Sequence, residues 1–457
     1  MVFSSTLFLF VFLPVLLVVY HGADPKYKNG VLLTASLLFY AWGEPRHILL
    51  LILSVAVNYI MGLLLEKKKR RSVLAIAVGY NLAMLFFFKY LNFAGHILET
   101  VLGIRLNIPT IALPIGISFY TFQIMSYVID VYRGTVPAQH SIADLALYIS
   151  LFPQLIAGPI VRYSDVEKQI RERTTDWNMI LEGTRRFAAG FSKKILLADQ
   201  LAKLADIAFE NGSPSIWLNW LGILAYTLQI YFDFSGYSDM AIGLGRMFGF
   251  RFLENFNYPY IAESIQDFWR RWHISLSSWF RDYLYIPLGG SRKGNLRTYI
   301  NQIIVFFLTG LWHGASFNFI VWGLFYAVFL IAERLGGKNI LGRCPKALRH
   351  VYALLIIMTG WVFFRAPGLK AALHYLLGMV TFSGKDIPNM IFVMNPLYWT
   401  CLAAGCFFAV PHVKIKKALE KNNSRETILD AIVFFFFVLA VCYMVGSGYS
   451  PFLYFRF

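Results

Sequence analysis

The 457-residue chain is 58% hydrophobic and only 15% charged, whereas a soluble domain carries about 25% charged residues. This composition excludes an ordinary soluble enzyme and a disordered chain, and four cysteines in so long a chain exclude a disulfide scaffold. The net charge of +17 indicates basic cytoplasmic loops rather than nucleic-acid binding, since the sequence contains no aromatic-basic recognition module. We therefore predict a polytopic helical membrane protein, whose length fits roughly 9–12 spans in the lipid bilayer.

Apolar runs of spanning or nearly spanning length recur along the chain. Basic stretches at 67–71 and 414–421 mark cytoplasmic loops. Residues 1–20 contain no lysine or arginine, so this segment is not a signal peptide, and the charge pattern predicts both termini outside the cytoplasm. No linker divides the chain, which predicts a single membrane domain over residues 1–457. The apolar runs lie near residues 4–20, 30–42, 47–65, 72–94, 111–131, 143–160, 216–234, 298–312, 315–332, 350–365, 391–411 and 427–446.

The centre of the chain departs from this pattern. Residues 162–203 are basic and amphipathic, which indicates helices lying at the inner membrane interface. Residues 233–290 are rich in glycine, proline, aromatic and polar residues. Irregular backbone at membrane depth survives only inside protein or around a water-filled cavity. We therefore expect re-entrant or half-length helices around a central cavity in an all-α fold.

His313 is the strongest candidate for a chemical role. It stands in the segment LWHG (311–314), and no charged residue occurs between Arg297 and Glu333. Because this stretch is too long for one ordinary span and glycines flank the histidine, we predict a helix break with His313 facing a cavity. An ionisable residue at membrane depth indicates function by default. The alternative is a buried histidine tied to a backbone carbonyl.

His273 lies in a second distinctive segment, DFWRRWHISL (267–276). On a continuous helix, one face carries two tryptophans, this histidine and a leucine, at positions 269, 272, 273 and 276. One interpretation is an interfacial helix with an aromatic belt and basic anchors. The other places His273 at the same cavity as His313, with Arg270 and Arg271 near enough to meet phosphates.

Two further segments stand out. YFDFSGYSD (231–239) holds two carboxylates in apolar surroundings, and we predict polar contacts between helices, with Asp233 paired to an arginine. FLYFRF (452–457) is aromatic where a free tail is expected to be polar, so we predict that it is buried in protein or membrane. The sequence contains no histidine pair with metal-site spacing, no phosphate-binding GK[ST] loop and no GxSxG elbow, which predicts no metal site.

Together these motifs resemble the membrane-bound O-acyltransferase family, in particular its bacterial alginate O-acetyltransferase branch. The resemblance runs through nearly the whole chain. It is carried by DFSGYSD (233–239), NFNYPY (255–260), DFWRRWH (267–273), RDYLYIPLGG (281–290), LWHG (311–314) and YFRF (454–457).

The resemblance implies a ring of about 10–12 transmembrane helices around a central tunnel in a bacterial inner membrane. It implies His313 as the catalytic residue, acetyl-CoA as the donor substrate and no tightly bound cofactor. The acetyl group is expected to reach an exported surface polysaccharide through an extracytoplasmic SGNH-type partner. We expect His273 to support His313, and Tyr454 to carry the acetyl group outward. The residues expected to bind coenzyme A are Arg185, Lys193, Arg270 and Arg271.

The predicted chemistry suits these residue types. A neutral imidazole, with an ordinary pKa of about 6.5, can take a proton from an attacking hydroxyl group, and a thioester is already activated without a metal. Two alternatives remain. One is D-alanyl transfer to teichoic acid from a carrier protein, and the other is transport of a polysaccharide precursor. Transport is less favoured, because the sequence shows no internal repeat and no cluster of membrane-embedded acids.

Overall fold

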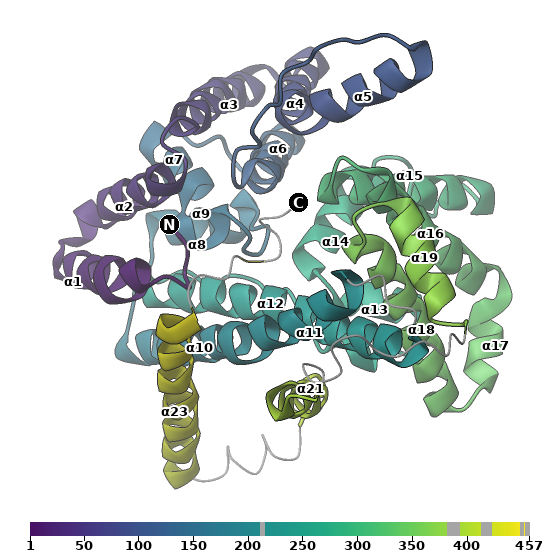
Figure 1. The fold of residues 1–457 in the computed structure, drawn as a ribbon. Coiled ribbons are helices and arrows are strands. Elements are labelled where there is room, and N and C mark those ends of the chain that lie inside the picture. Colours follow the sequence, from purple (N-terminus) through teal and green to yellow (C-terminus); the bar gives the residue numbers. More distant parts are fainter. Residues whose placement is uncertain (211–214, 382–393, 413–422, 448–451, 453–457) are drawn as a thin grey trace. The chain divides into compact units, whose positions relative to one another are not determined.

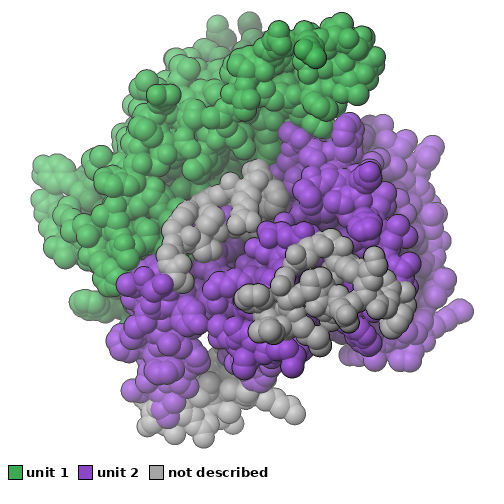
Figure 2. All heavy atoms as spheres, viewed as in Figure 1, with its two compact units in different colours: residues 1–187, 238–253 green, residues 188–237, 254–457 purple. Residues whose placement is uncertain are grey.

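The computed structural model describes residues 1–210, 215–381, 394–412, 423–447 and 452, and all regular elements within these ranges are helices (Figure 1). The predicted all-α fold is thereby confirmed. The chain divides into two compact units (Figure 2). Unit 1 comprises residues 1–187 and 238–253, and unit 2 comprises residues 188–237 and 254–457.

Unit 1 is organised around α6, which is buried along most of its length. This helix packs against α3 and α4, while α7 packs against α2 and α3. Asn58 of α3 and Asn81 of α4 exchange amide hydrogen bonds of 3.2 and 2.7 Å, and such polar pairs hold apolar helices in register. The elements are η1 Phe8–Phe12, α1 Leu13–Gly22, η2 Pro25–Tyr27, α2 Lys28–Gly43, α3 Ile48–Lys68, α4 Arg71–Leu85, η3 Phe86–Tyr90, α5 Leu91–Leu102, α6 Ile117–Arg133, α7 Ile142–Ser150, α8 Phe152–Leu155, α9 Tyr163–Arg171 and part of α10 Trp177–Ser192.

Unit 2 is built around an aromatic core in which α13, α16 and α18 pack together. It also holds most of the long helix α12, whose last residues belong to unit 1. The remaining elements are η4 Lys193–Ala198, α11 Asp199–Glu210, α12 Ile216–Met247, η5 Pro259–Ile261, α13 Ile265–Arg271, α14 Ile274–Phe280, η6 Arg281–Tyr285, α15 Asn295–His313, α16 Phe317–Ala332, η7 Glu333–Gly337, α17 Lys338–Arg343, α18 Lys346–Arg365, α19 Leu369–Gly378, α21 Pro396–Phe408 and α23 Asn423–Ser447.

Five helical stretches of the described chain are long and apolar enough to cross a bilayer. Several other predicted runs form shorter helices, such as α2 with 16 residues and α6 with 17. The basic stretch predicted at the inner interface is helical as α9, α10, η4 and α11. The five stretches are Ile48–Lys68, Arg71–Leu102, Phe317–Gly337, Lys346–Arg365 and Thr427–Gly446.

Two predicted elements are wrong in their bounds. The apolar run 143–160 is not one helix, because α7 ends at Ser150 and Leu151 turns away ahead of Pro153. A proline in a helix interior removes a hydrogen bond and clashes with the preceding turn. Half-length helices were expected from Asp233 onward, yet α12 continues through Asp233 to Met247. The short helices begin only after residue 254, with η5, α13 and α14.

Glu333 fixes the start of α13, the helix that leads to His273. Its carboxylate oxygens accept hydrogen bonds from the backbone N–H groups of Ile265 and Gln266, at 2.6 and 3.0 Å. A carboxylate at a helix N-terminus satisfies free N–H groups and interacts favourably with the helix dipole. The buried Glu333 thus ties α13 to the end of α16.

Close contact between α15 and α16 depends on two glycines (Figure 1). A Cβ atom at Gly310 would lie 2.2 Å from the carbonyl oxygen of Phe319, and one at Gly323 would lie 2.1 Å from that of Phe306. Both distances are below any tolerable van der Waals contact, so the two backbones meet only because side chains are absent. This is the small-residue packing typical of membrane helices.

We predict that Gly310→Ala separates α15 from α16 and destabilises the protein, since over-packing a close contact typically costs about 1–3 kcal/mol. Thermal unfolding of the detergent-purified protein measures the effect. Gly79→Ala in α4 is the control, because no atom lies within 4 Å of the added Cβ. Equal stability of Gly310→Ala and Gly79→Ala would contradict the glycine contact.

Candidate active site

His313 is the last residue of α15, and the predicted helix break at this position is confirmed. Gly314 leaves the helix in an extended conformation, and α16 starts at Phe317. The imidazole is 4% exposed, and the rings of Trp322 and Phe364 meet it nearly edge-on at centroid distances of 4.9 and 5.2 Å. An aromatic enclosure of this kind limits the access of water to the ring.

His273 does not lie on a continuous helical face, so that prediction is wrong. α13 ends at Arg271, α14 starts at Ile274, and His273 between them adopts the left-handed conformation with φ +45°. A non-glycine residue with positive φ is strained and persists only where its surroundings hold it. Asn255 holds this turn, because its backbone carbonyl accepts the N–H of Ile274 at 2.9 Å.

The Asn255 side chain also determines which nitrogen of His273 carries the proton. Its Oδ1 atom accepts the backbone N–H and the hydroxyl of Ser275, at 3.2 and 2.9 Å. Since a backbone N–H can only donate, this atom is the amide oxygen, and His273 Nδ1 at 3.1 Å must donate to it. Burial lowers the pKa of His273 to about 3. The neutral ring therefore presents Nε2 as a buried hydrogen-bond acceptor.

The fold brings the two predicted histidines into contact with one tryptophan. The indole of Trp312 lies 6.0 Å from the ring of His273 and 5.0 Å from that of His313. Phe234 of α12 meets His273 from another direction at 4.6 Å, with the rings perpendicular. Both histidines thus belong to a single aromatic cluster in unit 2.

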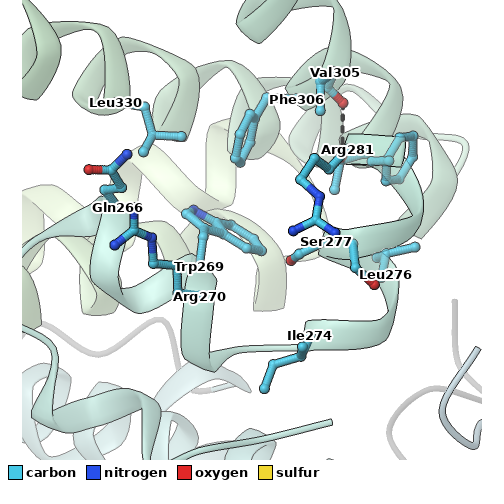
Figure 3. Close-up of a pocket in the computed structure, with 13 residues that line it drawn as sticks. Gln266, Trp269, Arg270, Ile274, Leu276, Ser277, Arg281, Val305, Phe306 and Leu330 are labelled. Carbon is cyan, nitrogen blue, oxygen red and sulfur yellow. Dashed lines mark hydrogen bonds between the residues drawn. The ribbon is translucent and has the colours of Figure 1, made fainter. Parts of the chain in front are cut away.

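A cavity of about 440 Å³ lies beside this cluster (Figure 3). Figure 3 shows Arg281 extending into it, with Trp269 across from the guanidinium and Arg270 next to Gln266. Its lining combines two arginines with hydroxyl and apolar side chains, and its size is typical of a ligand pocket. The lining residues are Gln266, Trp269, Arg270, Ile274, Leu276, Ser277, Ser278, Phe280, Arg281, Val305, Phe306, Thr309 and Leu330.

A thin aromatic wall separates this cavity from His313. Trp269 lines the cavity and contacts Trp322 at 5.8 Å, and Trp322 contacts His313 at 4.9 Å. Thr309 also lines the cavity, and it lies one helical turn before His313 on α15. Trp269 and Trp322 would therefore lie between a ligand in the cavity and the buried imidazole.

The other predicted site residues are distributed differently. Arg270 lines the cavity, whereas Arg271 pairs with Asp267 at 3.0 Å and is not among the lining residues. Arg185 belongs to α10 in unit 1, and Lys193 starts the π-helical segment η4 in unit 2. Tyr454 lies outside the described residues. Among the residues that the structure describes, no group of three His, Cys, Asp or Glu side chains is arranged to hold a metal ion.

Asp233 pairs with the buried Lys194, and its pairing with an arginine stays a prediction. In the same segment, Asp239 makes an arginine contact, with Arg186 at 2.7 Å. The burial of Lys194 could have been predicted from the sequence. At helical spacing it shares a face with Phe191 and Ala198, which are both buried. Asn255 and Arg281 had no comparable signal beyond their place in polar motifs.

Several known proteins are similar to this chain in sequence. The membrane-bound O-acyltransferase family model matches residues 131–373. The probable alginate O-acetylase AlgI of Pseudomonas putida is 41% identical, and the alignment covers 100% of both chains. The peptidoglycan O-acetyltransferase of Helicobacter pylori is 32% identical over 100% of this chain and 98% of its own length. The teichoic acid D-alanyltransferase of Bacillus subtilis is 30% identical over 47% of this chain and 58% of its own.

The chain therefore belongs to the membrane-bound O-acyltransferase family, and it is a multi-pass membrane enzyme. The hypothesis of a precursor transporter is not retained. The family resemblance predicts His313 as the catalytic residue. This histidine lies with His273 in the aromatic cluster described above.

We predict that Asn255→Ala destabilises the protein, because the buried donors on His273 and Ser275 lose their acceptor. Each buried donor left without a partner costs about 1–3 kcal/mol. Ser275→Ala is the control, since it removes one hydroxyl and leaves the other contacts of Asn255 in place. Thermal unfolding checks the order of stability. A variant Asn255→Ala as stable as Ser275→Ala would show that the amide does not hold His273.

Proposed function

We propose that this enzyme takes an acetyl group from cytoplasmic acetyl-CoA and delivers it across the bacterial inner membrane for O-acetylation of an exported polysaccharide. The observation that carries the proposal is the buried His313, which Trp269 and Trp322 connect to a cavity with two arginines. The names of two full-length relatives, an alginate O-acetylase and a peptidoglycan O-acetyltransferase, support acetyl as the group and a surface polymer as the final acceptor.

The cavity suits the donor better than the acceptor. Coenzyme A carries phosphates, and arginine guanidinium groups bind phosphate through paired hydrogen bonds. Arg281 is oriented by Asp282, through contacts of 2.7 and 3.0 Å, and Arg270 lines the same cavity. The pantetheine arm would follow the apolar wall past Trp269 and Thr309 towards His313. Acetyl-CoA enters this scheme as a substrate, with no tightly bound cofactor.

The transfer step needs a base and a dry site. In the proposed step, neutral His313 takes the proton of an attacking hydroxyl group while that oxygen bonds to the thioester carbonyl carbon. The carbon–sulfur bond then breaks, and the departing thiolate receives the proton from the imidazolium. The products are an acetyl ester and free coenzyme A. The aromatic side chains around His313 limit competing hydrolysis because they exclude water.

The attacking hydroxyl is proposed to be that of Tyr454. The charge pattern of the sequence predicts this segment on the outer side, where an extracytoplasmic SGNH-type partner would take the acetyl group. A phenol has an ordinary pKa near 10 and therefore needs a base, the role assigned to His313. An aryl ester is also a better acyl donor than an alkyl ester, which favours transfer from the tyrosine to a serine hydroxyl of the partner.

D-alanyl transfer to teichoic acid is a weaker alternative. The relative named for that reaction matches only 47% of this chain. The two reactions differ in their donor, which is a small thioester in one case and a carrier protein in the other. Proteoliposomes supplied with labelled acetyl-CoA on one side separate them. Label on the enzyme or on an acceptor supports the proposal, and transfer only from a D-alanyl carrier protein contradicts it.

We predict that His313→Ala lowers acetyl transfer in these vesicles by about 10²–10⁴-fold, the usual contribution of a general base. The exposed His374 provides the control, since His374→Ala leaves both the aromatic cluster and the cavity untouched. We expect His273→Ala to cause a smaller loss than His313→Ala. Wild-type turnover by folded His313→Ala would remove His313 from the reaction, and an equal, complete loss in His273→Ala with donor binding intact would give His273 a direct role.

We predict that Tyr454→Phe abolishes polymer acetylation, because it removes only the hydroxyl that receives the acetyl group. Mass spectrometry of wild-type enzyme incubated with acetyl-CoA, without a partner, is expected to detect acetyl-tyrosine at 454. Tyr449→Phe is the matched control in the same segment. Normal acetylation by Tyr454→Phe, or no acetylated tyrosine in the trapped enzyme, would mean that the acetyl group passes directly to the partner.

A further inference from the structure

A buried ion cluster lies where η4 meets α12 in unit 2. The ammonium of Lys194 is 2.7 Å from a carboxylate oxygen of Asp199 and 2.5 Å from one of Asp233, and the Lys194 side chain is 2% exposed. Burial alone lowers the pKa of this lysine, but Asp233 and Asp199 outweigh that effect and raise it, so the ammonium is charged. A π-helical segment such as η4 is a rare element that is frequently found at functional sites.

Phe452 packs directly on this cluster. The Lys194 ammonium lies 4.7 Å from the centroid of the Phe452 ring, within cation–π range. Tyr237 of α12 meets the same ring edge-on at 4.6 Å and 86°. Phe452 itself is 2% exposed. The ring therefore has a defined seat, which consists of Lys194 and Tyr237.

The helix that precedes Phe452 is attached to the same place. α23 ends at Ser447, five residues before Phe452, and it packs against η4. Phe437 of α23 contacts Phe191, which precedes η4, at 5.4 Å. Both α23 and Phe452 thus contact the short region around Lys194.

The segment DFSGYSD (233–239) assembles this seat. Asp233 pairs with Lys194, and Tyr237 contacts the ring of Phe452. A Cβ atom at Gly236 would lie 2.8 Å from the carbonyl oxygen of Gly190, so α12 and the end of α10 approach closely only because this residue is glycine. The neighbouring Phe234 contacts the ring of His273 at 4.6 Å. One stretch of α12 therefore links the seat of Phe452 to the histidine cluster.

We propose that Lys194, fixed by Asp199 and Asp233, is a positioning residue that seats Phe452 and so presents the segment that follows it to the cluster of His273 and His313. This inference rests on the proposed function, because the group presented is Tyr454, two residues after Phe452. Lys194 touches neither donor nor acceptor in this scheme. Its role is to make Phe452, and no other residue of the segment, the point of attachment.

A charged seat serves this purpose better than an apolar pocket. The segment 452–457 contains three phenylalanines, a leucine and a tyrosine, and an apolar pocket would accept any of them in several registers. A buried ion pair adds little net stability, because desolvation offsets the Coulomb attraction, but it can specify one arrangement. A cation–π contact requires an aromatic face over the ammonium, which excludes Leu453 from this position.

Release of Phe452 from its seat can be measured independently of acetyl transfer. Limited chymotrypsin digestion of the full-length protein in detergent, read by intact mass, follows cleavage after Tyr454 or Phe455. We expect Phe452→Leu and Lys194→Met each to speed this cleavage by about 2- to 30-fold, the range of a cation–π contact. The double variant should be no faster than the faster single variant. Lys203→Met, an exposed lysine on α11, should cleave like wild type.

Transfer kinetics test the positioning role. In Phe452→Leu, which leaves the ion cluster intact, we expect kcat for acetyl transfer to fall and KM for acetyl-CoA to stay unchanged. Lys194→Arg keeps a cation and should restore much of the kcat lost in Lys194→Met. Unchanged cleavage in Phe452→Leu, multiplicative effects in the double variant, or faster cleavage with normal kcat would each overturn the proposal.

Failure of the proposed function can be distinguished from failure of the inference about Lys194. Tyr454→Phe should lose transfer while its cleavage after Phe455 stays at the wild-type rate, since Phe452 remains seated. If wild-type protein transfers no acetyl group at all, the proposed function fails. The digestion experiment would still report whether Lys194 holds Phe452.

Discussion

A titratable histidine buried in an apolar helical hairpin is the constraint on which the rest of unit 2 depends. His313 ends α15, and the chain must leave the helix there without exposing polar backbone to lipid. Close packing of α15 on α16, through Gly310 and Gly323, places Phe319 and Trp322 around the break. Because the backbones touch, the imidazole is enclosed by rings and held away from bulk water.

Enclosure by aromatic side chains has a chemical consequence. A neutral imidazole is useful as a base only if competing water is absent and the substrate can still approach. Trp269 and Trp322 lie between His313 and the arginine-lined cavity, so these two rings decide how a ligand in the cavity could reach the imidazole. His273 is held differently, because Asn255 accepts hydrogen bonds from the backbone N–H of Ile274 and from His273 Nδ1, which fix the turn and the tautomer.

Helix α12 relates these parts to one another. Successive residues point in different directions around a helix, so Asp233 reaches Lys194 while Phe234 reaches His273. The same geometry explains why a stretch that looks like a mixture of polar and aromatic residues is a single, unbroken helix. Its two carboxylates pair with cations of neighbouring segments, Asp233 with Lys194 and Asp239 with Arg186.

The sequence by itself determined the class of the protein and the helix break at His313. Apolar composition dictates spanning helices, and an isolated histidine between glycines in an uncharged stretch dictates a helix break, because both effects are local. Predictions from local sequence patterns were wrong where a residue far along the chain determines the local conformation. His273 left the predicted helical face because Asn255, 18 residues earlier, holds it in the left-handed conformation. Asp233 pairs with Lys194 because only tertiary packing chooses among several neighbouring cations. The burial of Phe452 on Lys194 was likewise decided by the folded chain, since cation–π contacts and buried ion pairs depend on distances in space that no sequence spacing encodes.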